Sequence, residues 1–258
     1  MTKRYFIKLA FDGTRYHGWQ TQRNARTVQQ VLTDACSMIL REPVTLTGCG
    51  RTDAGVHARE FYAHFESEQL LDHNDCRKLV YQLNGFLGSD IAVYDVFPVK
   101  PRVHARFSAT SRTYEYVISR YKDPFQVDFA YFYSGSLDVG LMNKGADFLL
   151  SVSDFTSFSK VNTDTKTNFC RVTNAKWEQH GMNLVFSIRA DRFLRNMVRA
   201  IVGTLLGLGM GKISFDDFRQ IVAGKNRSDA GESVPAVGLF LVTVEYPEKL
   251  VMNPDDTD

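Results

Sequence analysis

The sequence predicts an α+β protein of two halves, in which helices cover one face of a largely antiparallel sheet. Of its 258 residues, 44% are hydrophobic and 23% are charged, which is ordinary for a folded globular chain. Segments with alternating apolar residues are interspersed with segments whose apolar residues recur at helical spacing. The order strand–helix–strand–helix–strand of the first part returns with additions in the second, although the two parts share no close sequence repeat.

The first half opens with a strand over 4–11, where apolar side chains alternate until Asp12 and Gly13 end it. Thr27 is the expected N-cap of a helix that Pro43 closes. One stripe of that helix is apolar and contains Val28, Val31, Leu32, Ala35 and Ile39. The remaining elements are a loop over 48–55, a strand over 60–65, a helix over about 74–87 and a strand over 91–97.

The second half contains more elements of the same two kinds. Strands are predicted over 112–119, 171–178, 183–190 and 238–246, and helices over 138–150, 192–208 and 214–223. We therefore divide the chain into an N-terminal half, 1–105, a C-terminal half, 106–247, and an acidic, flexible tail, 248–258.

Several protein classes are not expected. The four cysteines, Cys36, Cys49, Cys76 and Cys170, lack metal-ligand spacing and the histidines are scattered, so we predict neither a zinc site nor a disulfide framework. Reduced thiols in the cytoplasm are the simpler interpretation. A strand pattern begins at once, so no signal peptide is expected. The longest apolar stretch, 200–210, is too short and too rich in glycine to span a membrane.

The net charge of +2 is uninformative, but the bases are unevenly distributed. Residues 99–122 hold six bases, including Arg106 and Arg112, against the single acid Glu115. Residues 1–26 hold six bases against Asp12. Such clusters suit a polyanion, and a solvated basic face explains them equally well.

Asp53 lies in the run Gly50-Arg-Thr-Asp-Ala-Gly-Val-His57, where closely spaced glycines permit positive φ and close approach of the backbone to another group. Arg51 places a cation two residues before this carboxylate. Taken alone, the run favours an Asx-turn in which Asp53 caps the backbone. A catalytic role gains weight only from the other segments.

In the strand that begins at Arg112, the side chains of Arg112, Tyr114 and Tyr116 share one face. Flat rings beside a cation suit a stacked base and its phosphate. Cross-strand core packing explains the tyrosines as well. The terminal strand contains Leu239, which by itself indicates only core.

Arg192, Arg195 and Arg199 have the spacing i, i+3, i+7, so a helix starting near Asp191 would align them. An apolar stripe lies beside them, formed by Leu194, Val198, Ile201 and Leu205. Cations near a helix N-terminus oppose its dipole. The arrangement therefore predicts an anionic partner, which is RNA phosphate, a protein carboxylate or both.

Together these segments resemble the TruA family of pseudouridine synthases. The matching stretches are Tyr16-His-Gly-Trp-Gln with Thr27-Val-Gln, Gly50-Arg-Thr-Asp-Ala-Gly-Val-His, His104-Ala-Arg-Phe-Ser-Ala, Arg112-Thr-Tyr-Glu-Tyr, Asp154-Phe-Thr-Ser-Phe, Met197-Val-Arg-Ala-Ile-Val-Gly and Gly238-Leu-Phe-Leu. They follow the family's order from about residue 4 to 246. Each is weak alone, whereas the ordered set is highly specific.

The resemblance implies two pseudo-twofold-related halves around a central mixed, largely antiparallel sheet, with RNA in a positively charged cleft. It also implies a homodimer that binds the tRNA anticodon arm and isomerises uridines 38, 39 and 40 without a cofactor or a metal. One departure is Arg59-Glu60-Phe61, where the family more often has uncharged residues. This departure concerns the local RNA contact and leaves the chemistry untouched.

The resemblance also assigns roles by motif position. Asp53 is the catalytic aspartate, Arg51 helps to hold or displace the flipped base, and Tyr114 stacks on the target base. Arg199 pairs with Asp53, and Leu239 lines the pocket. Four more arginines are RNA-binding candidates: Arg106, Arg112, Arg192 and Arg195.

Two other functions compete with this one. A non-catalytic RNA-binding module would explain the basic clusters and Tyr114, but not an aspartate among glycines. A glycosidase-type hydrolase acting on nucleosides usually needs two carboxylates. The Asp53 loop offers no second one, since Glu60 is on the next strand.

Overall fold

The computed structural model describes residues 2–160, 166–248 and 250. The described residues form two compact units, one made of those up to residue 110 together with those from 241 on, and the other of those between 111 and 240. The chain thus returns to its first unit near residue 241. The predicted halves 1–105 and 106–247 instead assign residues 241–247 to the C-terminal half. Apart from Glu248 and Leu250, the predicted acidic tail lies outside the described residues.

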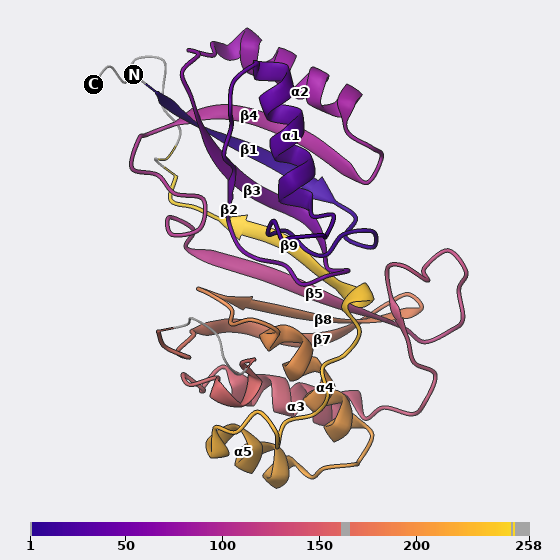
Figure 1. Cartoon of the computed structure of the whole chain (residues 1–258). Helices are drawn as coiled ribbons and strands as arrows, with labels where there is room; N and C mark the ends of the chain where they lie inside the picture. The colour runs from indigo at the N-terminus through magenta and orange to yellow at the C-terminus, as the bar shows by residue number, and fades with distance from the viewer. Residues whose placement is uncertain (1, 161–165, 249, 251–258) are drawn as a thin grey trace. The chain divides into compact units, whose positions relative to one another are not determined.

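The first unit is built on a mixed, largely antiparallel sheet (Figure 1). Its strands are β1 (Lys3–Phe11), β2 (Thr47–Gly48), β3 (His57–Ser67), β4 (Ile91–Val99) and the part of β9 (Leu239–Glu245) from Leu241 on. Their order is β4-β1-β3-β9, and β2 pairs with β3. The predicted strand over 60–65 is longer in the structure and begins at His57, the last residue of the Asp53 run.

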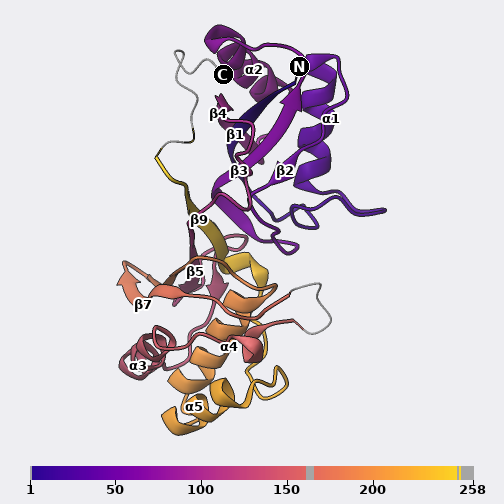
Figure 2. The same ribbon diagram turned by 90° about the vertical axis from the view of Figure 1, so that its left-hand side faces the viewer.

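One face of this sheet is covered by α1 (Val28–Leu40) and α2 (His73–Phe86), which contact each other (Figures 1 and 2). Alternate residues of β1 point into that core and are nearly inaccessible: Tyr5, Ile7, Leu9 and Phe11. The predicted cap of α1 is confirmed, because the Thr27 side chain accepts a hydrogen bond from the Gln30 N–H at 3.3 Å.

The opposite face of this sheet carries a cluster of aromatic side chains. Phe6, which is 1% exposed, contacts the rings of Tyr62, His64, Phe97 and Tyr246. These rings come from β1, β3, β4 and the residue just after β9. Both faces of β1 are therefore packed, which its nearly continuous apolar sequence permits.

The second unit repeats this kind of architecture (Figure 2). Its strands are β5 (Ser111–Ser119), β6 (Tyr131–Phe132), β7 (Val172–His180) and β8 (Asn183–Ala190). The order is β5-β8-β7 with antiparallel pairs, and β6 runs parallel to β5. Helix α3 (Val139–Leu149) packs on β7, α4 (Met197–Gly209) packs on α3, and α5 (Phe215–Gly224) contacts both helices. Two short 3₁₀ helices are η1 (Thr156–Phe158) and η2 (Ala236–Gly238).

The predicted helix over 192–208 is wrong at its start, because α4 begins at Met197. Its N-cap residue Asn196 has a left-handed backbone with φ of 66°, which breaks any continuous helix from Asp191. Arg192 and Arg195 precede the helix, so they do not share a helical side with Arg199. Of the three arginines, only Arg199 lies within α4, so Arg192 and Arg195 do not oppose the helix dipole from its first turns. The predicted apolar stripe is still buried: Leu194, Val198, Ile201 and Leu205.

The α+β class is confirmed in both units. In the part of the chain that the structure describes, no helix is long and apolar enough to cross a membrane. All four cysteines are buried free thiols.

The buried His64 should make stability depend on pH. Its side chain is 7% exposed and its Nδ1 accepts the Ala105 N–H at 3.1 Å. Burial, helped by His104 and Arg4, lowers the pKa of His64 to about 4. The unfolded chain therefore binds more protons than the folded one between pH 6.5 and about 4.

We predict that the free energy of unfolding falls by roughly 3 kcal/mol as the pH decreases through this window. Urea titrations at several pH values measure it. His64→Gln should flatten the pH profile, whereas His73→Gln, at an exposed position on α2, should keep the wild-type slope. A His64→Gln profile as steep as that of the wild type would contradict the assignment.

Candidate active site

Asp53 occupies a tight turn between β2 and β3 in the first unit. The Val56 N–H donates to the Asp53 carbonyl at 3.2 Å, and Gly55 takes the positive φ of 77° that such a turn requires. The Gly55 N–H donates to the Tyr16 carbonyl at 3.2 Å. Asp53 is half-buried and Arg51 is exposed. The turn expected from the glycines is thus present, and its backbone is held by the loop that follows β1.

That loop approaches the Asp53 turn at backbone distance. A Cβ on Gly18 would lie 2.2 Å from the Thr52 carbonyl oxygen, and one on Gly13 would lie 2.0 Å from the Val56 carbonyl oxygen. Gly18 also has a φ of 82°, which other residues rarely adopt. Side chains at these two positions would push the turn away, so the glycines fix where Asp53 stands.

The β1–α1 loop is itself anchored. The guanidinium of Arg26 lies 4.9 Å from the ring centre of Tyr16, which is 2% exposed. The Trp19 ring packs on Phe61 at 4.2 Å and fills the space where a Gly48 side chain would be. We call the β1–α1 loop, with its glycine contacts to the Asp53 turn, the clamp. The stretch Tyr16-His-Gly-Trp-Gln of the clamp matches the family in sequence, but nothing in the sequence links this stretch to Asp53.

Glu60, part of the departure from the family pattern, has partners within the first unit. Its Oε2 lies 2.7 Å from Lys8 Nζ, and its Oε1 accepts the Val244 N–H at 3.1 Å. The hydrogen bond to Glu60 raises the pKa of Lys8. Phe61 is core. The negative charge of Glu60 is therefore neutralised locally and serves to connect β3, β1 and β9.

The second unit carries Tyr114 on β5, opposite Ile188 of β8. Tyr114 is half-buried, and the ring of Phe193 meets it edge to face, with centroids 5.0 Å apart and planes at 80°. The sequence does not predict this contact, because Phe193 lies in the segment predicted as a helix. Its contact fixes the plane of the Tyr114 ring.

Tyr116 was grouped with Tyr114 as a possible stacking residue, but it belongs to the core. Its ring is 0% exposed and its hydroxyl donates to the Pro235 carbonyl at 2.8 Å. Burial raises the pKa of Tyr116 strongly. The strand therefore offers one accessible tyrosine instead of two.

Arg199 is held by the loop that joins α5 to η2. Its Nε donates to the Val234 carbonyl at 2.7 Å, and the Val234 N–H donates to the Arg199 carbonyl at 3.3 Å. The adjacent Ser233 hydroxyl accepts a hydrogen bond from Arg227 at 2.9 Å. Leu239, which is 6% exposed, follows directly after η2. The loop that fixes Arg199 thus leads through η2 to Leu239.

The remaining RNA-binding candidates lie at different places. Arg112 Nη1 donates to the Asp191 carbonyl at 3.0 Å. Arg192 is half-buried and Arg195 is exposed. Arg106, also exposed, belongs to the first unit and lies beside Phe107. Arg112 thus contacts the backbone of Asp191, the residue before Arg192, and the Asp191 carboxylate accepts the backbone N–H of Arg192 at 2.7 Å.

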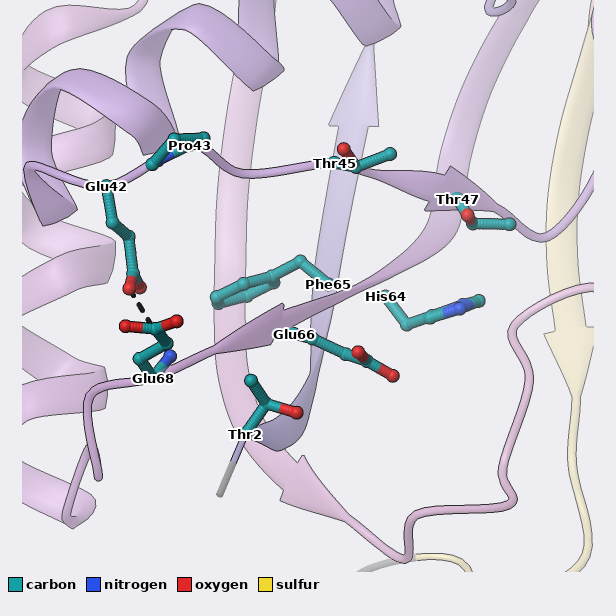
Figure 3. A pocket seen from close by; sticks show the side chains of 9 residues that line it. All are labelled: Thr2, Glu42, Pro43, Thr45, Thr47, His64, Phe65, Glu66 and Glu68. Carbon is teal, nitrogen blue, oxygen red and sulfur yellow. Dashed lines mark hydrogen bonds between the residues drawn. The ribbon is translucent and has the colours of Figure 1, made fainter.

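A groove of the first unit is a poor candidate for RNA (Figure 3). Its lining includes the carboxylates of Glu42, Glu66 and Glu68, which would repel phosphate. Arg4 pairs with Glu66, and the Glu68 N–H donates to Glu42 at 3.3 Å. Among the described residues, no group of His, Cys, Asp and Glu side chains could hold a metal ion.

Comparison with known proteins identifies the family of the chain. The sequence profile of a family described as tRNA pseudouridine synthase matches residues 151–247. A tRNA pseudouridine synthase A from Parabacteroides distasonis is 51% identical over 248 residues, which cover 96% of this chain and 98% of that protein. The Bacteroides fragilis protein of the same name is 52% identical over 96% and 98% of the two chains, and the Aeromonas salmonicida protein 38% over 96% and 92%. With such similarity over nearly its whole length, the chain belongs to the tRNA pseudouridine synthase A family.

Proposed function

We propose that this enzyme converts uridine to pseudouridine at positions 38, 39 and 40 of the tRNA anticodon arm, with Asp53 as its catalytic residue. The observation that carries the proposal is the position of the Asp53 turn. The backbone of the β1–α1 loop holds this turn in place at Gly13 and Gly18, where no side chain would fit. The names of the similar proteins support tRNA as the substrate. We further propose that the chain acts in the cytoplasm as a homodimer, as the family resemblance implies.

The reaction is an isomerisation. The bond between N1 of uracil and C1′ of ribose breaks, the base rotates, and a bond from C5 to C1′ replaces it. The hydrogen on C5 leaves as a proton and N1 takes up a proton, so the atoms and electrons balance without a redox partner. The ionised Asp53 carboxylate acts either as the nucleophile at C1′ or as the base that removes the C2′ proton.

A uridine inside a stem is inaccessible, so the enzyme must flip it out at a cost of a few kcal/mol. Tyr114 stacks on the flipped base and offsets part of this cost, since such stacking contributes about 1–3 kcal/mol. Its contact with Phe193 supports this role, because a ring with a fixed plane loses little entropy on binding. The family resemblance further implies that Arg51 holds or displaces the base, that Arg199 pairs with Asp53, and that Leu239 lines the pocket.

Replacing the carboxylate should abolish turnover without abolishing binding. We predict that Asp53→Asn and Asp53→Ala release no tritium from tRNA that contains 5-tritiated uridine, while their tRNA affinity stays within about twofold of the wild type. Asp34→Asn, at an exposed position on α1, is the matched control and should remain active. Substantial tritium release by either Asp53 variant would remove Asp53 from the chemistry.

The glycine contact of the clamp gives a second test. Gly18→Ala should lower tritium release by about a hundredfold, because a methyl group would displace Thr52 and Asp53, and a shift of about 1 Å costs this much. Gly85→Ala, on the surface of α2 with no atom within 4 Å of the new methyl group, should be fully active. A folded and fully active Gly18→Ala variant would show that the clamp does not position Asp53.

Salt dependence tests the arginines that precede α4. If Arg192 and Arg195 contact phosphates, Arg192→Ala and Arg195→Ala should weaken tRNA binding. Each should also reduce the slope of log affinity against log salt by about 0.7–0.9. Arg219→Ala, on α5, should keep the wild-type slope, because Arg219 pairs with Asp216 at 3.6 Å. Wild-type slopes for the first two variants would place these arginines away from the RNA.

A further inference from the structure

The segment Val103–Ser108, which follows β4, is tied to the first unit by three side chains. Arg4 Nη1 donates to the Val103 carbonyl at 2.8 Å, and the Ala105 N–H donates to His64 Nδ1 at 3.1 Å. The Tyr246 hydroxyl donates to the Ala105 carbonyl at 2.6 Å. The three side chains come from β1, β3 and the residue that follows β9. This connection is therefore held to three separate parts of the sheet.

The same segment is also closed on itself through His104. Its Nδ1 accepts the N–H groups of Arg106 at 3.0 Å and Phe107 at 3.4 Å. The His104 N–H donates to the Ser108 hydroxyl at 2.9 Å, and its carbonyl accepts the Ser108 N–H at 2.9 Å. Burial, together with the charges of Arg4 and Arg106, lowers the pKa of His104, which favours the neutral ring that can accept these bonds.

This rigid turn presents an aromatic ring to solvent. Phe107 is 76% exposed, although phenylalanine side chains are usually buried in folded proteins. The His104 ring supports it from one side at 4.4 Å, and the guanidinium of Arg106 lies 5.6 Å from its centre. A single exposed ring is common on protein surfaces. This ring, however, is held on a hydrogen-bonded turn beside a guanidinium, and a ring next to a cation suits a stacked base and its phosphate.

The charge of the chain segment that carries the ring indicates what the ring binds. From Lys100 to Arg112 the chain carries four bases and no acid, and Lys100, Arg102 and Arg106 are exposed. A protein partner with an apolar surface would not require this positive charge, whereas a nucleic-acid strand supplies both a flat base and a phosphate.

We infer that Phe107 and Arg106 form a nucleotide platform, on which Phe107 stacks with an unpaired base of the RNA substrate and Arg106 contacts the adjoining phosphate. The inference rests on the proposed function only in taking tRNA as the RNA. The platform lies in the first unit and is distinct from Tyr114, which belongs to the second. Because every base has a flat face, the platform tolerates different nucleotides and adds affinity without requiring one sequence.

Binding of an unmodified tRNA transcript, followed by fluorescence anisotropy, tests the platform. Phe107→Ala should weaken binding about five- to hundredfold, Phe107→Trp should restore it to within about twofold of the wild type, and Phe107→Leu should not. Tyr81→Ala is the matched control, because Tyr81 is 81% exposed on α2 of the same unit. It should bind like the wild type.

Two results would overturn the platform: wild-type affinity of Phe107→Ala, or full restoration by Phe107→Leu, which keeps an apolar contact but cannot stack. If Phe107→Ala changes sedimentation of the protein but not its tRNA affinity, Phe107 contacts another copy of the chain and the inference is wrong. The proposed function fails separately, when the wild-type chain binds tRNA in a Phe107-dependent way and yet releases no tritium.

Discussion

The backbone of the Asp53 turn passes Gly18 so closely that a single methyl group there would lie 2.2 Å from the Thr52 carbonyl oxygen. Several elements of the first unit position the two loops that make this contact. The pairing of β1 with β3 brings the two loops side by side, because the β1–α1 loop leaves the end of β1 where β3 begins. Trp19 of this loop packs on Phe61 of β3. A catalytic group must be held within about half an ångström of its productive position, and backbone contact achieves this better than long side chains do.

Local patterns predicted the elements because burial alternates simply along them. The inward positions of β1, the Thr27 cap and the stripe that includes Val198 and Ile201 all follow from spacing alone. The start of α4 could not be predicted in this way. Leu194 has the spacing of the helical stripe and is buried, yet Asn196 adopts a left-handed backbone that no periodicity reveals.

The candidate site shows the same division. The sequence singles out Asp53 only when its run is taken together with the other matching segments, because the run alone favours a turn. Contacts between segments distant in sequence were not recognisable: the carbonyl of Val234 that accepts a hydrogen bond from Arg199, and the Phe193 ring against Tyr114. Alternation placed Tyr114 and Tyr116 on one face, but only packing could show that Tyr116 is fully buried. Spacing identifies residue types, whereas three-dimensional partners decide which of them are accessible.

In the proposed reaction, the first unit supplies the Asp53 carboxylate, and the second supplies the Tyr114 ring and Arg199. The most direct test of this account is to map pseudouridine, nucleotide by nucleotide, in the tRNA of a strain that lacks this gene and carries either the wild-type or the Asp53→Asn copy. The account predicts that pseudouridine at positions 38, 39 and 40 is absent from the deletion strain, returns with the wild-type copy and stays absent with the variant. Unchanged pseudouridine in the deletion strain, or restoration by Asp53→Asn, would contradict it.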